Sequence, residues 1–453
     1  MMNAFHAYDI RGIYNADFTA EDVYKIGFFL PKLLGVKKVL VGRDCRTSSP
    51  EIHKALTRGI CDAGADVYDL GLSTTPQVYF ATGKHGFEAS VQITASHNSR
   101  EYNGLKISKA KAMPVGYESG LNLLEAWIGA GNPAAARSIV PSAQRGQVVP
   151  FSVRDEYLAF LRGYVSDFTH LKIGMDLSNG MAALFMKELL GAGPLYIFDE
   201  LDGTFPNHEP NPLILSNIKA LQELVVGAQC DIGVIFDGDA DRVMFVDESG
   251  RFIPPDLMIG VLGHYFLGEK GLRARVLQDI RTSKAVGEYL TPMGAEMHTW
   301  RVGRAFAAPK LREIDGIFGG ELAGHYYFKD FFYSDSGIMA ALIILGVANR
   351  MKAQGVSVSQ LVGAIARYHN SGEINYKIDK KQEAMELIRD FFVSKEEPTA
   401  SFDFDGYRVE FPDWWFNVRP SNTEPYLRFI VEARSLELLQ EKVDIVNKLI
   451  KKM

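Results

Sequence analysis

Over its first two-thirds, this chain alternates short β-rich runs with amphipathic helical stretches. Such alternation is typical of α/β domains. Three units in this part each open with a strand that runs into an aspartate, at residues 39–44, 173–176 and 276–279. This internal echo is weak, but it indicates three related α/β domains.

The expected elements can be placed along these three units. In the first unit we expect strands at 37–42, 65–70 and 88–93 and a helix over 50–64, which ends at a glycine. In the second we expect strands at 171–177, 196–198 and 231–236 and a helix over 181–190. The third starts near residue 252, with strands at 275–279 and 296–300, and the apolar run 337–348 predicts a buried helix.

The last part of the chain has a different pattern. We expect a strand at 374–378, a helix over 381–393, three β-rich runs between 401 and 433, and a final amphipathic helix over 435–452. This order predicts a separate α+β domain rather than a fourth α/β copy. With linkers at 132–146 and around 369–373, we divide the 453 residues into domains at 1–145, 146–250, 251–370 and 371–453.

The composition limits the compartment and the kinds of partner. Hydrophobic residues make up 47% and charged residues 23% of the chain, as in soluble globular proteins. The three cysteines form no CxxC pair, so we expect a reducing compartment and no disulfide framework. Residues 1–11 are polar and lack the apolar stretch typical of a signal peptide, and the run 337–348 is too short to span a bilayer. We therefore expect a cytoplasmic protein without a membrane partner, and the net charge of −6 argues against nucleic acid.

Three aspartates follow an apolar run at alternate positions, as Asp237, Asp239 and Asp241. Their carboxylates would repel one another unless a cation lies between them, and hard oxygen donors suit magnesium or calcium. A solvated acidic turn is the simpler interpretation. An EF-hand would place Glu248 as the twelfth ligand, but Arg242 stands where that loop needs glycine and the flanks are predicted strands.

Ser96 lies at a strand-to-loop junction beside a histidine, in the pentapeptide Thr-Ala-Ser-His-Asn. A hydroxyl in this position could be a nucleophile that its neighbours activate. An ordinary polar turn explains the pentapeptide equally well. A serine hydrolase gains no support, because the GxSxG motif is missing.

Three further polar segments suit a phosphorylated sugar. Residues 419–425 place a guanidinium, two hydroxyls and an amide in one Pro-bounded turn, which suits phosphate oxygens. Residues 319–325 combine glycines with a carboxylate and an imidazole that could hold sugar hydroxyls, and the N-terminal Tyr-Asp-Ile-Arg-Gly is a weaker signal. Each segment alone could be a plain loop, but the five motifs together indicate phosphoryl transfer on a carbohydrate.

With these five motifs in order, the whole chain closely resembles the α-D-phosphohexomutase superfamily, in its phosphomannomutase/phosphoglucomutase branch. The resemblance implies three related α/β domains plus a C-terminal α+β domain around a central cleft. It implies an enzyme that interconverts hexose 1-phosphate and hexose 6-phosphate, with Mg²⁺ as cofactor and hexose 1,6-bisphosphate as intermediate and activator. A monomer or weak homodimer is expected.

The resemblance also implies a role for individual residues. Ser96 would carry the phosphoryl group and, with Asp237, Asp239 and Asp241, bind magnesium. His97 and Arg242 would neighbour the phosphoserine, and Lys106, His325 and Arg11 would be catalytic, Lys106 if nearby cations depress its pKa. The expected substrate-binding residues are Tyr8, Arg281, Arg304, Glu321, Arg419, Ser421, Asn422 and Thr423.

The chain departs from the family pattern at four positions, and two rival functions are open. Ser99 replaces a usual proline, Ala323 a serine, Arg304 a histidine and Arg281 a lysine, so the preferred hexose is not fixed. A haloacid-dehalogenase-type phosphatase would use Asp237 as nucleophile but leave Ser96 without a role. A non-catalytic sugar-phosphate sensor would predict erosion of the serine or of the acidic triad, and both are intact.

Overall fold

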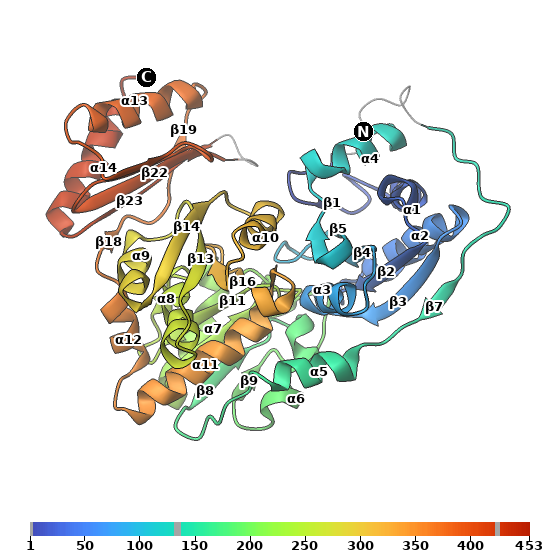
Figure 1. Ribbon diagram of the computed structural model, residues 1–453, viewed down its shortest axis with the longest axis horizontal. Helices are drawn as coiled ribbons and strands as arrows, with labels where there is room; N and C mark the ends of the chain where they lie inside the picture. Colours follow the sequence, from blue (N-terminus) through green and yellow to red (C-terminus); the bar gives the residue numbers. More distant parts are fainter. Residues whose placement is uncertain (1–2, 131–136, 422–425) are drawn as a thin grey trace.

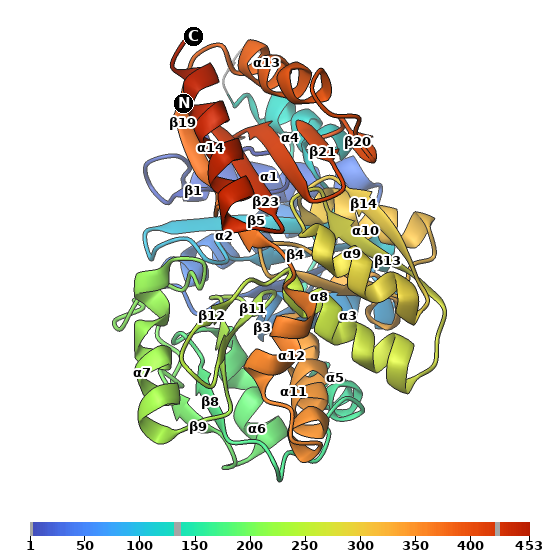
Figure 2. The same cartoon turned by 90° about the vertical axis from the view of Figure 1, so that its left-hand side faces the viewer.

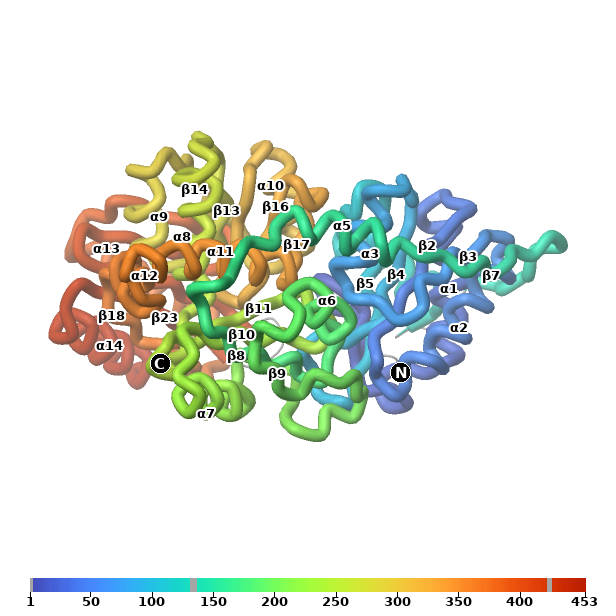
Figure 3. Tube along the Cα trace, turned by 90° about the horizontal axis from the view of Figure 1, so that it is seen from below, coloured from blue at the N-terminus to red at the C-terminus, as the bar shows by residue number. Residues whose placement is uncertain are grey.

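The structure, a computed structural model, describes residues 3–130, 137–421 and 426–453. The chain forms four consecutive units (Figure 1). The first and last units lie at the two ends of the long axis, with the second and third between them (Figure 3). Seen from the end of the C-terminal unit, that unit lies above the second one (Figure 2).

The first unit is built on one mixed sheet of the order β1-β5-β4-β2-β3-β7, with β6 paired to β5. Its strands are β1 (Ile10–Ile13), β2 (Lys38–Arg43), β3 (Asp66–Leu72), β4 (Ala89–Ile93), β5 (Tyr102–Lys109), β6 (Met113–Pro114) and β7 (Val148–Pro150). Its helices are α1 (Ala20–Leu34), α2 (Ser49–Asp62), α3 (Thr75–Lys84) and α4 (Leu121–Ile128). Because β7 pairs with β3, this sheet extends past residue 145, so we place the first boundary after Pro150.

The second unit has a five-stranded sheet of the order β12-β11-β10-β8-β9. Its elements are α5 (Arg154–Arg162), β8 (Ile173–Asp176), α6 (Met186–Leu190), β9 (Leu195–Ile197), α7 (Lys219–Ala228), β10 (Ile232–Phe236), β11 (Val243–Asp247) and β12 (Phe252–Ile253). The single helix that we predicted over 181–190 is wrong. A 3₁₀ turn at Met181–Leu184 and the short α6 replace it, separated by Phe185, whose backbone leaves the helical conformation.

The third unit has a sheet of the order β14-β13-β15-β16-β17. Its strands are β13 (Ala274–Asp279), β14 (Ala295–Trp300), β15 (Phe318–Gly320), β16 (Tyr326–Phe328) and β17 (Ser334–Asp335). Its helices are α8 (Leu257–Gly263), α9 (Lys284–Leu290), α10 (Arg304–Glu313), α11 (Gly337–Ala353) and α12 (Val358–Ile365). The predicted buried helix is confirmed in α11, which is apolar all round and buried over its first thirteen residues. Among the described helices none is long and apolar enough to cross a membrane.

The three sheets repeat one strand order, which confirms the internal echo in the sequence. In each sheet the strand that leads to the aspartate (β2, β8 or β13) lies between the next two strands of the chain, and the strand after these is antiparallel. The aspartate at the end of each of these strands, or directly after it, also repeats a contact. The carboxylates of Asp44, Asp176 and Asp279 accept hydrogen bonds from the backbone N–H two residues later, at 3.1, 2.7 and 2.6 Å. The fold is therefore three related α/β domains.

The C-terminal domain is antiparallel and differs from the other three. Its strands are β18 (His369–Asn370), β19 (Ile374–Lys377), β20 (Ala400–Phe402), β21 (Tyr407–Glu410), β22 (Trp414–Pro420) and β23 (Tyr426–Ala433). Its helices α13 (Lys381–Val393) and α14 (Leu436–Ile450) pack on this sheet around a core of their own. The predicted α+β domain is confirmed, although four strands rather than three occupy the region between 400 and 433.

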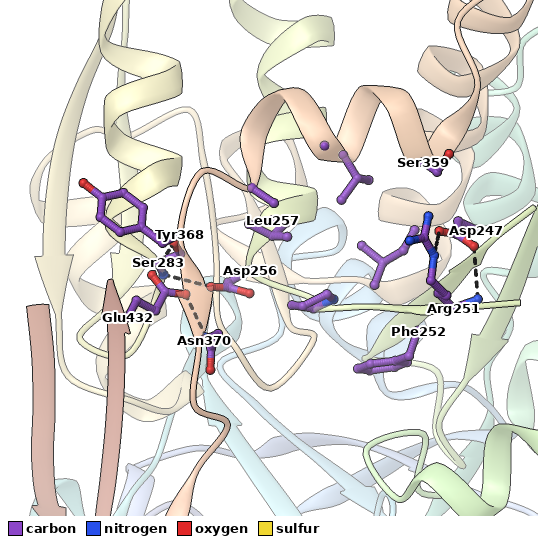
Figure 4. Close-up of a pocket in the computed structure, with 15 residues that line it drawn as sticks. Asp247, Arg251, Phe252, Asp256, Leu257, Ser283, Ser359, Tyr368, Asn370 and Glu432 are labelled. Carbon is purple, nitrogen blue, oxygen red and sulfur yellow. Dashed lines mark hydrogen bonds and ion pairs between the residues drawn. The ribbon is translucent and has the colours of Figure 1, made fainter. Parts of the chain in front are cut away.

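A buried polar junction attaches the C-terminal domain to the third domain. Arg408 donates to the carbonyl oxygens of Ile280 and Thr282, at 2.9 and 2.5 Å. Glu432 accepts a 2.6 Å hydrogen bond from the hydroxyl of Ser283. Beside these contacts lies a cavity of about 290 Å³ at the meeting of three domains (Figure 4). The loop at 279–283 is therefore held by the last domain, which bears on the position of Arg281 in the site.

This junction contains two acidic side chains with few counter-charges. The Ser283 N–H donates to Asp256 at 2.8 Å, while the Ser283 hydroxyl binds Glu432, so that one serine bridges both carboxylates (Figure 4). Burial, reinforced by the nearby Glu432 and partly offset by the Ser283 N–H, raises the pKa of Asp256 to about 7. The folded protein therefore holds a proton here that an unfolded chain would release near pH 4.

Asp256→Asn is expected to change how stability depends on pH. The stabilising effect of this proton is fully present below about pH 4 and is lost as pH rises through 7, because the unfolded state then binds fewer protons than the native state. The loss amounts to up to about 4 kcal/mol. Urea unfolding of both proteins at pH 5 and pH 8 should show the variant gaining stability relative to wild type at pH 8. Parallel pH profiles would contradict the burial argument.

Candidate active site

Three hairpin loops meet to form the candidate site, one from each α/β domain. The loops, at residues 94–101, 237–242 and 321–325, follow β4, β10 and β15. Carboxyl ends of parallel strands commonly carry ligand sites in α/β folds. Arg242 and His325 form a β-bridge between the second and third loops. The second loop also touches the first, since a Cβ at Gly238 would lie 2.5 Å from the Ser96 carbonyl oxygen.

Ser96 occupies the tip of the first loop in a strained backbone conformation. Its φ is 54°, in the left-handed region, and only 1% of its surface is exposed. Its hydroxyl donates to Asp237 at 2.9 Å, and its N–H donates to Thr94 at 2.9 Å. Such strain persists only where surrounding contacts fix the backbone. The serine is therefore held against the acidic triad by the fold.

Arg46 supplies much of this support, and sequence reasoning missed it. The side chain is fully buried and donates to four carbonyl oxygens at 2.6–3.1 Å, those of Ser96, Asn98 and Ser99 in the serine loop and of Tyr102 at the start of β5. Its Nε pairs with Asp44 at 3.2 Å. The available signal was the match between Asp-Cys-Arg-Thr-Ser at 44–48 and Asp-Ile-Arg-Thr-Ser at 279–283.

The acidic triad is buried and brings its oxygens together. Asp237, Asp239 and Asp241 are at most 1% exposed, and one oxygen from each lies within 4.8 Å of the others. Among the described residues, one oxygen of Asp239 and one of Asp241 have no hydrogen-bond partner. Burial, with the neighbouring Asp239 and Asp241 carboxylates, raises the pKa of Asp237 well above its usual value. Such a donor set fits a hard divalent cation.

Lys106, on β5, pairs with two carboxylates of this triad and offsets part of their negative charge. Its Nζ lies 2.7 Å from Asp239 and 2.5 Å from Asp241. Burial lowers the pKa of Lys106, but the Asp239 and Asp241 charges more than offset this effect, and the net pKa is raised. The expected depression of its pKa by nearby cations is therefore not found, because its closest neighbours are carboxylates. Thr75, at the start of α3, also donates its hydroxyl to Asp239.

Three further predicted residues surround Ser96. Arg11 donates to the Asn98 side chain at 2.8 Å, and Nδ1 of His97 lies 3.4 Å from the Ser96 hydroxyl. Burial and the positive charges of Arg242 and Arg11 hold the pKa of His97 well below its usual value, so this ring is neutral. Arg242 donates its backbone N–H to Asp237 at 3.1 Å. The serine thus lies between two arginines and a triad of carboxylates.

A cavity of about 140 Å³ opens beside these groups and is lined by predicted residues of all three α/β domains. Those that we predicted and find here are Tyr8, Arg11, Lys106, Asp241, Arg242, Arg304, Glu321 and His325, together with Ala323. Glu321 accepts from the Gly303 N–H at 3.1 Å and from the Tyr327 hydroxyl at 2.6 Å. Burial, opposed by the nearby His325, raises the pKa of Glu321.

Two arginines lie near each other at the C-terminal domain's side of the site. Arg281 is held by Asp279 at 2.8 Å, on the loop that Arg408 anchors. Arg419 is 5% exposed and lies 3.6 Å from Asp405, and its Nε and Nη1 have no hydrogen-bond partner among the described residues. Burial and the positive charge of Arg281 lower the pKa of Arg419. Ser421 is buried beside it, whereas Asn422 and Thr423 lie outside the described residues.

The comparisons with known proteins cover the whole chain. The phosphoglucomutase/phosphomannomutase alpha/beta/alpha domains I, II and III match residues 2–127, 155–250 and 254–368, and the C-terminal domain matches 373–449. A phosphomannomutase of Escherichia coli is 35% identical over 467 residues, covering 99% of both chains. One of Methanocaldococcus jannaschii is 34% identical, covering 99% of this chain and 98% of its own.

A solved structure agrees with these relatives. A phosphoglucomutase/phosphomannomutase family protein from Burkholderia thailandensis has a TM-score of 0.87 at 27% identity, covering 100% of this chain and 98% of that one. The four domains, with a serine facing a buried acidic triad, define a phosphohexomutase enzyme. Within that class, the chain belongs to the phosphoglucomutase/phosphomannomutase family.

Proposed function

We propose that this protein interconverts mannose 1-phosphate and mannose 6-phosphate, and also the corresponding glucose phosphates, through a phosphoserine at Ser96. The observation that carries the proposal is the Ser96 hydroxyl, 2.9 Å from a carboxylate of a buried acidic triad. The relatives named phosphomannomutase support mannose as a substrate. Family membership across all four domains favours this function over a dehalogenase-type phosphatase or a sensor.

Magnesium is the cofactor that the donor set supports. Asp237, Asp239 and Asp241 would hold it, together with an oxygen on Ser96, since each aspartate offers an oxygen in the same small volume. When bound, the ion would offset negative charge on the transferring phosphoryl group. Lys106, which pairs with two of these aspartates, would then be displaced or share them.

The transfer itself makes one P–O bond and breaks another. The bond between phosphorus and Ser96 Oγ breaks while a bond to the free sugar hydroxyl forms. The hydroxyl proton goes to a base, for which His325 is our candidate, and Ser96 Oγ receives a proton from an acid, for which Lys106 is our candidate. The resulting hexose 1,6-bisphosphate turns round, and the reverse transfer of its other phosphate to Ser96 leaves the product. The same bisphosphate primes the serine as activator.

Substrate binding divides between a sugar end and a phosphate end. Glu321 is fixed by Gly303 and Tyr327 and would accept from sugar hydroxyls. Arg419, whose Nε and Nη1 have no hydrogen-bond partner among the described residues although Nη1 lies 3.6 Å from Asp405, and Arg281 would hold the phosphate that is not being transferred. Tyr8 packs on the backbone of Gly303, where a Cβ would approach its ring to 2.9 Å, and closes the first domain onto this end.

A coupled assay tests the function directly. Purified enzyme with Mg²⁺ and a trace of hexose 1,6-bisphosphate should convert mannose 1-phosphate and glucose 1-phosphate to the 6-phosphates. Conversion of glucosamine 6-phosphate alone would refute the proposed substrate, and release of inorganic phosphate from each sugar would favour the phosphatase. We also propose a cytoplasmic monomer or weak homodimer that acts without nucleic acid or membrane partners.

Arg419→Ala is expected to raise the KM for mannose 1-phosphate and mannose 6-phosphate to a similar degree. A charge-assisted hydrogen bond to phosphate is worth roughly 1.5–3 kcal/mol, so about 10- to 100-fold is expected. The KM rises for both substrates because each phosphate of the bisphosphate occupies this end of the site once per cycle. Initial rates in both directions measure the effect, and Arg389→Ala, on α13 of the same domain, is the control. An effect in only one direction would contradict the shared role.

A further inference from the structure

Asp335 is a buried carboxylate that binds two residues of the active-site cavity without lining it. It ends β17, is 0% exposed, and is absent from the described residues around the cavity. One of its oxygens accepts from His325 Nδ1 at 2.6 Å, and the other accepts from Arg304 Nε at 3.1 Å. Asp335 therefore acts on the site through these two contacts and through its negative charge, which opposes the net lowering of the Asp241 pKa.

The contact with His325 fixes the protonation pattern of the imidazole ring. A carboxylate can only accept, so Nδ1 must carry the hydrogen, and Nε2 is then the nitrogen left to exchange a proton with substrate. Burial raises the pKa of Asp335, but the hydrogen bond from His325 and the charge of Arg304 more than offset it, and the net pKa is lowered. The carboxylate therefore stays ionised and keeps its two acceptor oxygens.

The contact with Arg304 ties Asp335 to the first domain. The guanidinium donates through Nη2 to the carbonyl of Ala112 at 2.8 Å and lies over the Tyr79 ring at 3.7 Å. Ala112 has a left-handed φ of 57°, so this carbonyl belongs to a strained turn that the arginine helps to hold. Arg304 thus binds both Asp335 and the first domain, and its positive charge offsets the negative charge of Asp335.

We propose that Asp335 is a positioning residue that keeps His325 in the Nδ1–H form, with Nε2 directed to the reacting sugar. The same carboxylate holds the guanidinium of Arg304 in place. The proposal rests on the proposed mutase function for its kinetic consequence. Its structural part, the tautomer, does not. General acid–base groups of this kind contribute about 10²- to 10⁴-fold to rate, so misplacing one has a measurable cost.

Asp335→Asn is expected to turn Nδ1 of His325 from a hydrogen-bond donor into an acceptor. Asparagine has one acceptor oxygen, and Arg304, which can only donate, should retain it. The amide NH₂ then faces His325 Nδ1 at hydrogen-bond distance, whereas the carboxylate of Asp241 lies further away, at 3.8 Å from the same nitrogen. We therefore expect Nδ1 to accept and the ring proton to move to Nε2. We expect kcat to fall about 100-fold while KM stays within about threefold, because Asp335 acts through His325 rather than on binding.

Two measurements separate positioning from a merely structural role. Long-range ¹H–¹⁵N NMR of the imidazole ring, assigned with His325→Gln, should show Nδ1–H in wild type and Nε2–H in Asp335→Asn. In the His325→Gln background, Asp335→Asn should lower kcat less than about threefold further. Asp315→Asn, an exposed carboxylate of the same domain that pairs with Lys329, should leave the tautomer and kcat unchanged.

The proposal is overturned by an Nε2–H tautomer in wild-type protein, which needs no variant and no activity. It is equally overturned if Asp335→Asn keeps kcat within threefold of wild type, or if it lowers kcat as strongly in the His325→Gln background. Wild-type protein that lacks mutase activity but shows the Nδ1–H tautomer would refute the proposed function and uphold the positioning contact.

Discussion

Ser96→Ala is expected to lower kcat by at least about 10⁴-fold, the largest effect of any single change, because it removes the oxygen that carries the phosphoryl group. Alanine retains the Cβ, so the left-handed backbone at this position and its support by Arg46 should persist. The thermal midpoint should therefore stay close to that of wild type. Coupled assays at saturating hexose phosphate, with circular dichroism melts, measure both quantities.

A neighbouring serine provides the matched control. Ser99 lies three residues further along the same loop, and its hydroxyl bonds Glu101 rather than the acidic triad. Ser99→Ala should keep kcat within about threefold of wild type, since surface hydroxyls contribute little. Substantial turnover by Ser96→Ala would show that phosphoryl transfer does not pass through this oxygen.

Asp239→Asn is expected to lower kcat by about 10²- to 10³-fold and to raise the Mg²⁺ concentration needed for half-maximal rate. The change removes one of three buried charges that a cation would balance. Stability should respond much less, because the amide keeps an oxygen for Lys106 and Thr75, and repulsion with Asp237 falls. Magnesium titrations of rate and melts of the metal-free protein give the two readouts.

Asp199→Asn tests whether the loss of any carboxylate from the second domain would change kcat and its Mg²⁺ dependence. Asp199 pairs with Lys187 outside the triad, so its loss should leave the Mg²⁺ dependence unchanged. Chelator-treated wild-type protein that keeps its full rate without added metal would contradict the assignment of the triad.

Much of the fold could be predicted because its signals are local. The strand-to-aspartate echo at Asp44, Asp176 and Asp279 marks three real repeats, and the apolar run in α11 is a buried helix. The predictions of the fold that are wrong concern features set by contacts between segments distant in sequence. β7 follows a linker yet pairs with β3, and the backbone breaks at Phe185 within an otherwise helical pattern. Neither feature leaves a periodic signal in its own segment.

Site residues could be predicted where the reacting groups lie together in one short motif. Residues that hold these groups in place from another part of the chain were missed. Ser96 and the three aspartates stand in short motifs after strands. Arg46 and Asp335 act on loops 50 and 10 residues away in sequence, through contacts that only the folded chain creates. The pKa of Lys106 could not be foreseen for the same reason, since its carboxylate neighbours belong to another domain.

The most direct test of phosphoryl transfer through Ser96 is to locate the phosphate on the enzyme itself. Purified protein incubated with Mg²⁺ and hexose 1,6-bisphosphate should be digested and analysed by peptide mass spectrometry with site localisation. We predict a phosphate on Ser96. Its occupancy should fall when a large excess of hexose 1-phosphate is added without further bisphosphate, because the sugar accepts the phosphoryl group and part of the bisphosphate formed leaves the enzyme. A phosphate found reproducibly on Asp237, with none on Ser96, would contradict the mutase mechanism and favour a phosphatase.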